Sequence, residues 1–263
     1  MNLKRITFLI FLFVCTSSFA GDIVYLQKSP TPKSEREAIL ILVGFGSKLH
    51  NERKIAKHFR DQGYDIYQPK YVYRKSIQQG VLKLQAFTEK HDLKAYKKLH
   101  VVCYIIGGWT FNNWVNSSGL TNIQSIIYDR SPLQERAPQV LMEDSKTITK
   151  LYIGKIIQEF ADTPYPPLVD SKANIGVMIE TEPTKLIRKH RKSAAAMGPI
   201  SWKVTDLNQP FSDYCYIPVD HDELYTNVKL VSPLIFEFLK TGKFGDSCNR
   251  TAPSIDPLIE LTK

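Results

Sequence analysis

The turn Gly44-Phe45-Gly46 is a first candidate for a phosphate-binding site. Glycine-rich turns between a strand and a helix can bind phosphate through backbone N–H groups. A dinucleotide site needs a third glycine three residues further on, where Leu49 stands, and an acid at the end of the second strand. Asp65 is at about the right distance, but it opens its strand. We therefore expect no nucleotide here, and the sequence indicates no other cofactor.

The histidines and cysteines are the residues that could bind metal or form disulfides. No His-x-x-x-His or Cys-x-x-Cys spacing occurs, so the sequence predicts no metal site. His221 lies between two aspartates and could be just a hydrogen-bonded loop residue. Cys103 lies in an apolar strand pattern and is expected to be a buried thiol. Cys215 and Cys248 are then the one disulfide pair that we expect.

The first 20 residues have the three parts of a secretory signal. Lys4 and Arg5 form the charged start, residues 6–14 the apolar run, and Ser18-Phe19-Ala20 a small-x-small cleavage site. An uncleaved membrane anchor is the alternative, but the run is far shorter than the roughly 20 residues that span a bilayer. We therefore expect a periplasmic or secreted protein that begins at Gly21 in an oxidising compartment.

The composition is that of a globular protein. The chain has 263 residues, of which 43% are apolar, 11% aromatic and 23% charged. These values exclude the disordered, collagen-like and disulfide-scaffold classes. Without the signal segment the net charge is about +7, which favours contact with anionic surfaces.

The densest basic stretch has no interleaved aromatic residues and no nucleic-acid motif. We expect a solvated helix face, with phospholipid headgroups or anionic glycans as alternative contacts and no nucleic acid. It comprises Lys185, Arg188, Lys189, His190, Arg191 and Lys192.

Strand and helix patterns alternate along the chain, without repeats. Residues 38–43 are continuously apolar, which is typical of a strand buried on both faces of a parallel sheet. The alternation predicts an α/β fold with a doubly wound, mostly parallel sheet. We expect one domain over residues 21–263, with an irregular tail from about residue 245. Further strands are expected at 65–68, 100–106, 123–128, 174–179 and 214–219, and helices at 51–62, within 76–99, and at 143–160, 184–196 and 228–239.

The order of these parts resembles the α/β-hydrolase family of esterases and lipases. Gly44-Phe45-Gly46-Ser47 stands where the family has its oxyanion loop, and Cys103-Tyr104-Ile105-Ile106-Gly107-Gly108 where it has Gly-x-Ser-x-Gly-Gly. The acidic turn Glu180-Thr181-Glu182-Pro183 follows a penultimate strand. Pro218-Val219-Asp220-His221-Asp222-Glu223-Leu224-Tyr225 and the next helix look like the family's histidine loop and closing helix. The resemblance covers about residues 38–244 and implies esters or lipids as ancestral substrates.

The resemblance implies a triad of nucleophile, acid and histidine in that chain order, but the nucleophile is missing. Ile105 stands at the serine position, and an aliphatic side chain has no lone pair with which to attack. His221 takes the histidine position, with Glu180 or Glu182 as its orienting acid. Backbone N–H groups could still form an oxyanion hole, because they do not depend on side-chain identity. The resemblance assigns these to Phe45 and Ile106.

Other side chains could replace the serine. Thr110, Cys103 and Ser47 are the nearest in sequence, although Thr110 is expected to lie a helical turn too deep and Cys103 inside its strand. Gly245-Asp246-Ser247 resembles a GDS-type esterase signature, but it lies in the C-terminal tail instead of after the first strand. Asp129-Arg130-Ser131 follows a strand end and is expected at the pocket rim or in a capped turn.

Two functions follow from this reading. The first is a degenerate hydrolase that binds a small-molecule or lipid-like ligand without turning it over. The second is a working esterase or lipase with a non-standard nucleophile, or with water activated by His221. The sequence does not indicate the oligomeric state.

Overall fold

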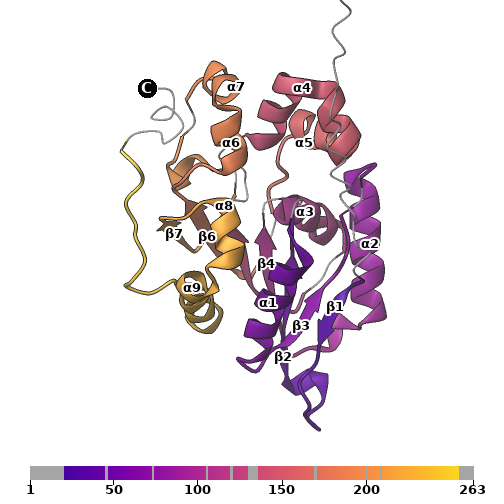
Figure 1. Cartoon of the computed structure of the whole chain (residues 1–263). Helices are drawn as coiled ribbons and strands as arrows, with labels where there is room; N and C mark the ends of the chain where they lie inside the picture. The colour runs from indigo at the N-terminus through magenta and orange to yellow at the C-terminus, as the bar shows by residue number, and fades with distance from the viewer. Residues whose placement is uncertain are drawn as a thin grey trace, which may run out of the picture.

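The structure is a computed structural model that describes residues 21–44, 47–72, 74–104, 106–118, 121–129, 136–168, 171–199, 201–207 and 209–254. The expected signal segment lies outside the described residues. Within them, seven strands form one sheet in the order β1-β3-β2-β4-β5-β6-β7 (Figure 1). β1 runs antiparallel to β3, and the other neighbours are parallel. The strands are β1 Ile23–Tyr25, β2 Glu37–Leu42, β3 Asp65–Gln68, β4 Lys98–Tyr104, β5 Ile123–Asp129, β6 Asn174–Glu180 and β7 Asp213–Ile217.

Helices connect the strands, which confirms the expected doubly wound α/β sheet. The helices are α1 Leu49–Arg60, α2 Ile77–Lys90, α3 Ile106–Ser118, α4 Ala137–Ile153, α5 Ile156–Asp162, α6 Lys185–Lys189, α7 Arg191–Ala196, α8 His221–Thr226 and α9 Val228–Thr241, with short 3-10 turns at Lys33–Glu35, Leu93–Ala95 and Val204–Asp206. The single helix expected at 143–160 is two helices, because the chain turns at Gly154 with a φ of 106°. None of the described helices has the length and apolar character of a membrane span.

The continuous apolar run of β2 is buried on both faces of the sheet, as expected. Ile39 and Ile41 pack with side chains of α1 and α9, whereas Leu40 and Leu42 pack with side chains of α2 and α3. All four side chains are completely buried. β2 therefore lies inside the sheet and fixes the position of the strands on either side of it.

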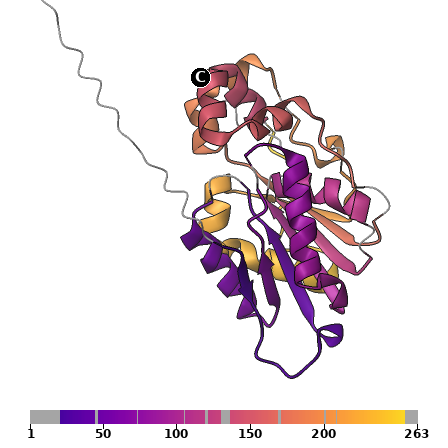
Figure 2. The ribbon, with the colours of Figure 1, turned by 90° about the vertical axis from the view of Figure 1, so that its right-hand side faces the viewer.

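Helices α4 to α7 gather at one end of the molecule, above the sheet in both views (Figures 1 and 2). They follow β5 and β6, so they leave from the carboxyl ends of these parallel strands. Val140 of α4, Ile187 of α6 and Ala194 of α7 pack into one apolar cluster with Val177 and Ile179 of β6. These helices therefore stand over the sheet edge at which open α/β folds bind ligands.

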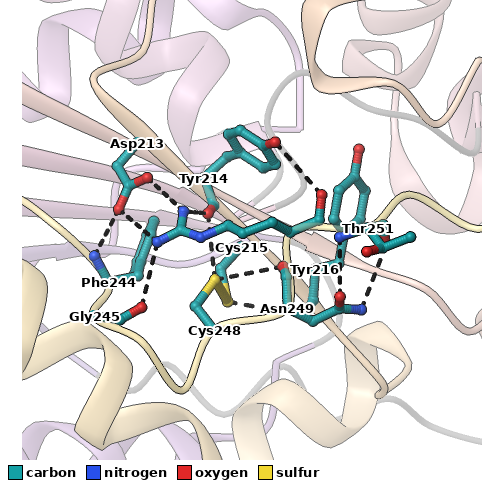
Figure 3. Close-up of a disulfide and its surroundings, with 10 residues drawn as sticks. Asp213, Tyr214, Cys215, Tyr216, Phe244, Gly245, Cys248, Asn249 and Thr251 are labelled. Carbon is teal, nitrogen blue, oxygen red and sulfur yellow. Dashed lines mark hydrogen bonds and ion pairs between the residues drawn. A yellow bond between two sulfur atoms is a disulfide. The ribbon is translucent and has the colours of Figure 1, made fainter.

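Between α9 and residue 254, where the description ends, the chain forms no helix or named strand, but a disulfide fixes it to the sheet. Cys248 is bonded to Cys215 of β7, which confirms the expected pair (Figure 3). Next to it, Asn249 forms an antiparallel bridge with Tyr216. Cys103, the remaining cysteine of the described residues, is a buried free thiol as predicted.

An ion pair and a packed ring hold the same segment. Arg250 is paired with Asp213, and the Asp213 carboxylate also accepts a 2.8 Å hydrogen bond from the Phe244 N–H. The Phe244 ring packs against Phe238, over Gly176 of β6, where an added Cβ would lie 2.8 Å from both rings. The part of the expected irregular tail up to residue 254 is therefore anchored at one edge of the sheet, and the rest lies outside the described residues.

Candidate active site

Four neighbouring strands bring polar side chains to one edge of the sheet. β4 ends at Tyr104, β5 at Asp129 and β6 at Glu180, and β7 leads into His221 at the start of α8. The pairing places Tyr104 beside Asp129 and Glu180 beside Ile217. Because these strands are parallel, their carboxyl ends lie side by side, and residues far apart in the chain meet there.

The backbone at His221 is fixed by a capping box. Asp220 is the N-cap of α8, and its side chain accepts a 2.9 Å hydrogen bond from the Glu223 N–H. The Glu223 carboxylate in turn accepts a 3.2 Å hydrogen bond from the Asp220 N–H. This reciprocal arrangement satisfies two amides that helix formation leaves without intrahelical acceptors. It also holds His221, the first residue of the helix, in one orientation.

The His221 ring meets two buried carboxylates. Its Nδ1 lies 3.1 Å from Oε1 of Glu180 and 3.6 Å from Oδ2 of Asp129. Both acids are buried, and only a tenth of the His221 side chain is exposed. When Nδ1–H donates to the carboxylate, the other ring nitrogen is left as a base. The imidazole is therefore held as a hydrogen-bonded group inside the protein, not as a surface loop residue.

Of the two acids that the sequence offered as partners of His221, one contacts the ring and the other does not. Glu180 is completely buried and contacts the ring. Glu182 is exposed and is paired instead with Arg188 at 3.3 Å. Asp129, expected at the pocket rim, is buried beside the imidazole. Its position at the end of the adjacent strand was the available signal, but the sequence could not show that it turns inward.

Tyr104 borders the same cluster from β4. Burial is the main cause that raises the pKa of its phenol, and the nearby Asp129 and Glu180 raise it further. The phenol therefore stays protonated, and it is unsuited to act as an anionic nucleophile.

Strand β4 and helix α3 are joined by a very short connection. β4 ends at Tyr104 and α3 begins at Ile106, so only position 105 separates them. A Cβ added to Gly107 would lie 2.3 Å from the carbonyl oxygen of Leu42 in β2. Only glycine permits this approach of helix and strand, and the hydrolase motif that the sequence resembles has glycine two residues after its serine. Ile105 itself lies outside the described residues.

The expected oxyanion donors are described in part. Ile106 is the first residue of α3, so its N–H belongs to the first turn, where amides have no intrahelical acceptor. Phe45, the other expected donor, lies outside the described residues.

The three side chains that could replace the serine as nucleophile are buried or hydrogen-bonded elsewhere. Cys103 is completely buried, and burial raises the pKa of its thiol well above the usual range. Thr110 is buried beneath α2, near Gly80. The Ser47 hydroxyl donates a hydrogen bond to Glu52. Arg130 and Ser131 lie outside the described residues.

The structure brings together possible metal ligands that the sequence spacing did not reveal. One donor atom from each of Asp129, Glu180 and His221 lies within 4.8 Å of the other two. The expectation of no metal site was based on ligands close in sequence, whereas these three come from separate strand ends.

The basic stretch lies on α6 and α7, at the end of the molecule above the sheet (Figure 1). Its Lys and Arg residues are exposed, and Arg188 is paired with Glu182. His190 is half-buried, and its Nδ1 contacts Asp144 of α4 at 2.9 Å. The stretch is a solvated face of two short helices, as expected. Exposure of its cations Lys185, Lys189, Arg191 and Lys192 does not by itself identify a binding partner.

No protein-family model matches the chain, and no curated protein matches its sequence. Solved structures match its fold. A structure of the metagenome-derived lipolytic enzymes LipS and LipT has a TM-score of 0.50 at 10% identity, over 84% of this chain and 97% of that chain. A lipase-esterase related protein from Clostridium acetobutylicum has a TM-score of 0.50 at 14% identity, over 82% and 98% of the two chains.

An esterase from Thermogutta terrifontis likewise has a TM-score of 0.50 at 10% identity, over 85% of this chain and 99% of that chain. At such identities the likeness concerns the fold alone. The chain has the α/β-hydrolase fold, which confirms the fold expected from the order of its sequence motifs.

Proposed function

We propose that this protein is an exported, non-catalytic relative of esterases and lipases that acts by binding a small-molecule or lipid-like ligand. The observation that carries the proposal is the turn after β4. Gly107 aligns with the glycine that stands two residues after the serine of the hydrolase motif. The position of the nucleophile is therefore 105, which holds isoleucine. Isoleucine cannot form the covalent intermediate on which this class of hydrolysis depends.

The surroundings of the turn support the same conclusion. Cys103 and Thr110 are buried, and the Ser47 hydroxyl donates a hydrogen bond to Glu52 of α1. The buried His221 and Glu180 pair would remain as a polar anchor for a ligand group that donates to or accepts from the imidazole. Buried polar groups of this kind fix the orientation of ligands in otherwise apolar pockets.

An active hydrolase is the second candidate, and one observation favours it. The His221 imidazole and the carboxylates of Asp129 and Glu180 lie buried in an ordered cluster. Burying charged groups costs free energy of desolvation, and a function in catalysis would explain why the cluster is retained. The His221 imidazole could activate water, or an unconventional nucleophile could act with it. This candidate requires a group that attacks the substrate in place of the residue 105 side chain.

Export and a contact with anionic surfaces are parts of the proposal. The disulfide between Cys215 and Cys248 supports an oxidising compartment, since such bonds are rare in the cytosol. The exposed cations of α6 and α7 support contact with phospholipid headgroups or anionic glycans.

The test compares hydrolysis of p-nitrophenyl esters by the mature protein, by Ile105→Ser, and by Ile105→Ser combined with His221→Ala. Loss of a triad member leaves at most about 10³–10⁴-fold acceleration over water, so we expect negligible turnover by the natural protein. Ile105→Ser should gain weak activity that the double variant loses. Efficient turnover by the natural protein that His221→Ala removes would support the active hydrolase instead.

A further inference from the structure

We infer that Asp129, Glu180 and His221 form a binding site for one divalent metal ion of the zinc class. The inference goes beyond the proposed function, because a metal could bind whether or not the protein turns over esters. It is based on the convergence of one nitrogen and two carboxylate oxygens at a single buried point.

The distances suit a metal of this size. Bonds of about 2.0–2.2 Å in tetrahedral geometry put neighbouring ligand atoms about 3.3 Å apart. His221 Nδ1 lies 3.1 Å from Glu180 Oε1 and 3.6 Å from Asp129 Oδ2, which brackets this value. All three donor atoms lie within 4.8 Å of one another. Small side-chain rotations would bring the two carboxylates to the separation that a bound ion requires.

The ligand types also suit zinc. Neutral imidazole and carboxylates are common zinc ligands, and three protein ligands with one open position are typical of sites that keep a water molecule. The single proton on Nδ1 can bridge to only one carboxylate at a time, whereas a divalent cation binds the nitrogen and both carboxylates together.

The backbone holds the three ligands rigidly. Asp129 and Glu180 are the last residues of paired strands, and His221 is fixed by the capping box at the start of α8. A site built on strand ends and a capped helix keeps its geometry better than a site on loops. Access is restricted but present, because His221 is 8% exposed while the two acids are buried.

The experiment measures zinc binding to the untagged, exported full chain after treatment with a chelator. Calorimetry should give one Zn²⁺ per molecule, and Co²⁺ should give a visible absorption spectrum of four-coordinate cobalt. His221→Ala, Asp129→Asn and Glu180→Gln should each weaken binding at least about 10-fold, as loss of metal-site residues does. Circular dichroism shows which variants fold.

Two variants serve as matched controls. Glu182→Gln changes an exposed acid two residues from Glu180, and His190→Ala removes a histidine in contact with Asp144 outside the site. Both should bind Zn²⁺ as the natural protein does.

The inference is overturned if the folded natural protein binds no stoichiometric Zn²⁺ or Co²⁺. It is also overturned if binding persists in His221→Ala or if His190→Ala abolishes it. The natural protein decides the first point even where a site variant does not fold. Ester turnover plays no part in these measurements, so failure here and failure of the proposed function are distinguishable.

Discussion

Nδ1 of His221 lies 3.1 Å from Oε1 of Glu180, although 41 residues separate them in the chain. Glu180 ends β6, while His221 begins α8 just after β7, so the parallel pairing of these strands brings them together. In the proposed function, this contact is the acid–histidine half of a hydrolase triad whose nucleophile position, 105, holds isoleucine. This combination of a preserved half and a missing nucleophile is the basis of the proposed binding function.

Gly107→Ala should destabilise the fold strongly. The new methyl group would lie 2.3 Å from the Leu42 carbonyl oxygen, so α3 would have to move away from β2. Overpacking of this kind costs about 1–3 kcal/mol or more in the free energy of unfolding. Denaturant unfolding measures it, with Gly80→Ala as control, because a Cβ there would be 3.4 Å from its nearest neighbour. Equal stability of the two variants would contradict the close packing of α3 against β2 at Gly107.

Removing the disulfide should destabilise the protein without changing its fold. Cys215 and Cys248 are 33 residues apart, and a loop of this size corresponds to about 2–4 kcal/mol from chain entropy. The double variant Cys215→Ser/Cys248→Ser should unfold at lower denaturant concentration, and the reduced natural protein should match it. Cys103→Ala, which changes the free thiol, should not alter the response to reductant. If reductant did not change the unfolding of the natural protein, the disulfide would not contribute to its stability, which would contradict the prediction.

The Arg250 and Asp213 pair should contribute to stability in a pH-dependent way. Burial tends to raise the pKa of Asp213, but the Arg250 guanidinium and the N–H groups of Phe244 and Tyr214 lower it overall. Because the folded-state pKa is depressed, the contribution is present above the unfolded pKa of about 3.9. It is lost as the pH falls below that value through the folded-state pKa.

Arg250→Ala should therefore cost about 1–3 kcal/mol at pH 7, because it leaves a buried carboxylate with fewer partners. The loss should shrink as the pH falls below about 4. Arg188→Ala, at the exposed pair with Glu182, should change stability by less than about 1 kcal/mol. Unfolding curves between pH 2 and 7 provide the measurement, and an Arg250→Ala effect that grows toward low pH would contradict the assignment.

Much of the sheet could be predicted from the sequence, because its inner strands are continuously apolar. The expected strand at 65–68 coincides with β3, and the expected strands at 123–128 and 174–179 are each one residue shorter than β5 and β6. β1 could not be recognised, since it is three residues long and pairs only at the edge. α8 was missed because a six-residue helix at a histidine loop has no periodicity of its own.

The site was predicted less completely. The sequence offered Glu180 and Glu182 equally, because neighbouring residues in a turn do not reveal which one points inward. Asp129 was expected only at the rim, as its contact with His221 depends on the alignment of three parallel strands. The sequence predicted the bond from Cys248 to Cys215, but not the ion pair of Arg250 with Asp213, since that contact depends on the tail reaching β7 across the fold.

If the protein acts by binding, no side chain attacks a substrate from the connection between β4 and α3. The most direct measurement is reaction of the folded protein with a serine-directed fluorophosphonate, followed by mass spectrometry of its peptides. The natural protein should remain unlabelled, whereas Ile105→Ser should be labelled at position 105. Stoichiometric labelling of any residue in the natural protein, abolished by His221→Ala, would contradict the account and identify the nucleophile.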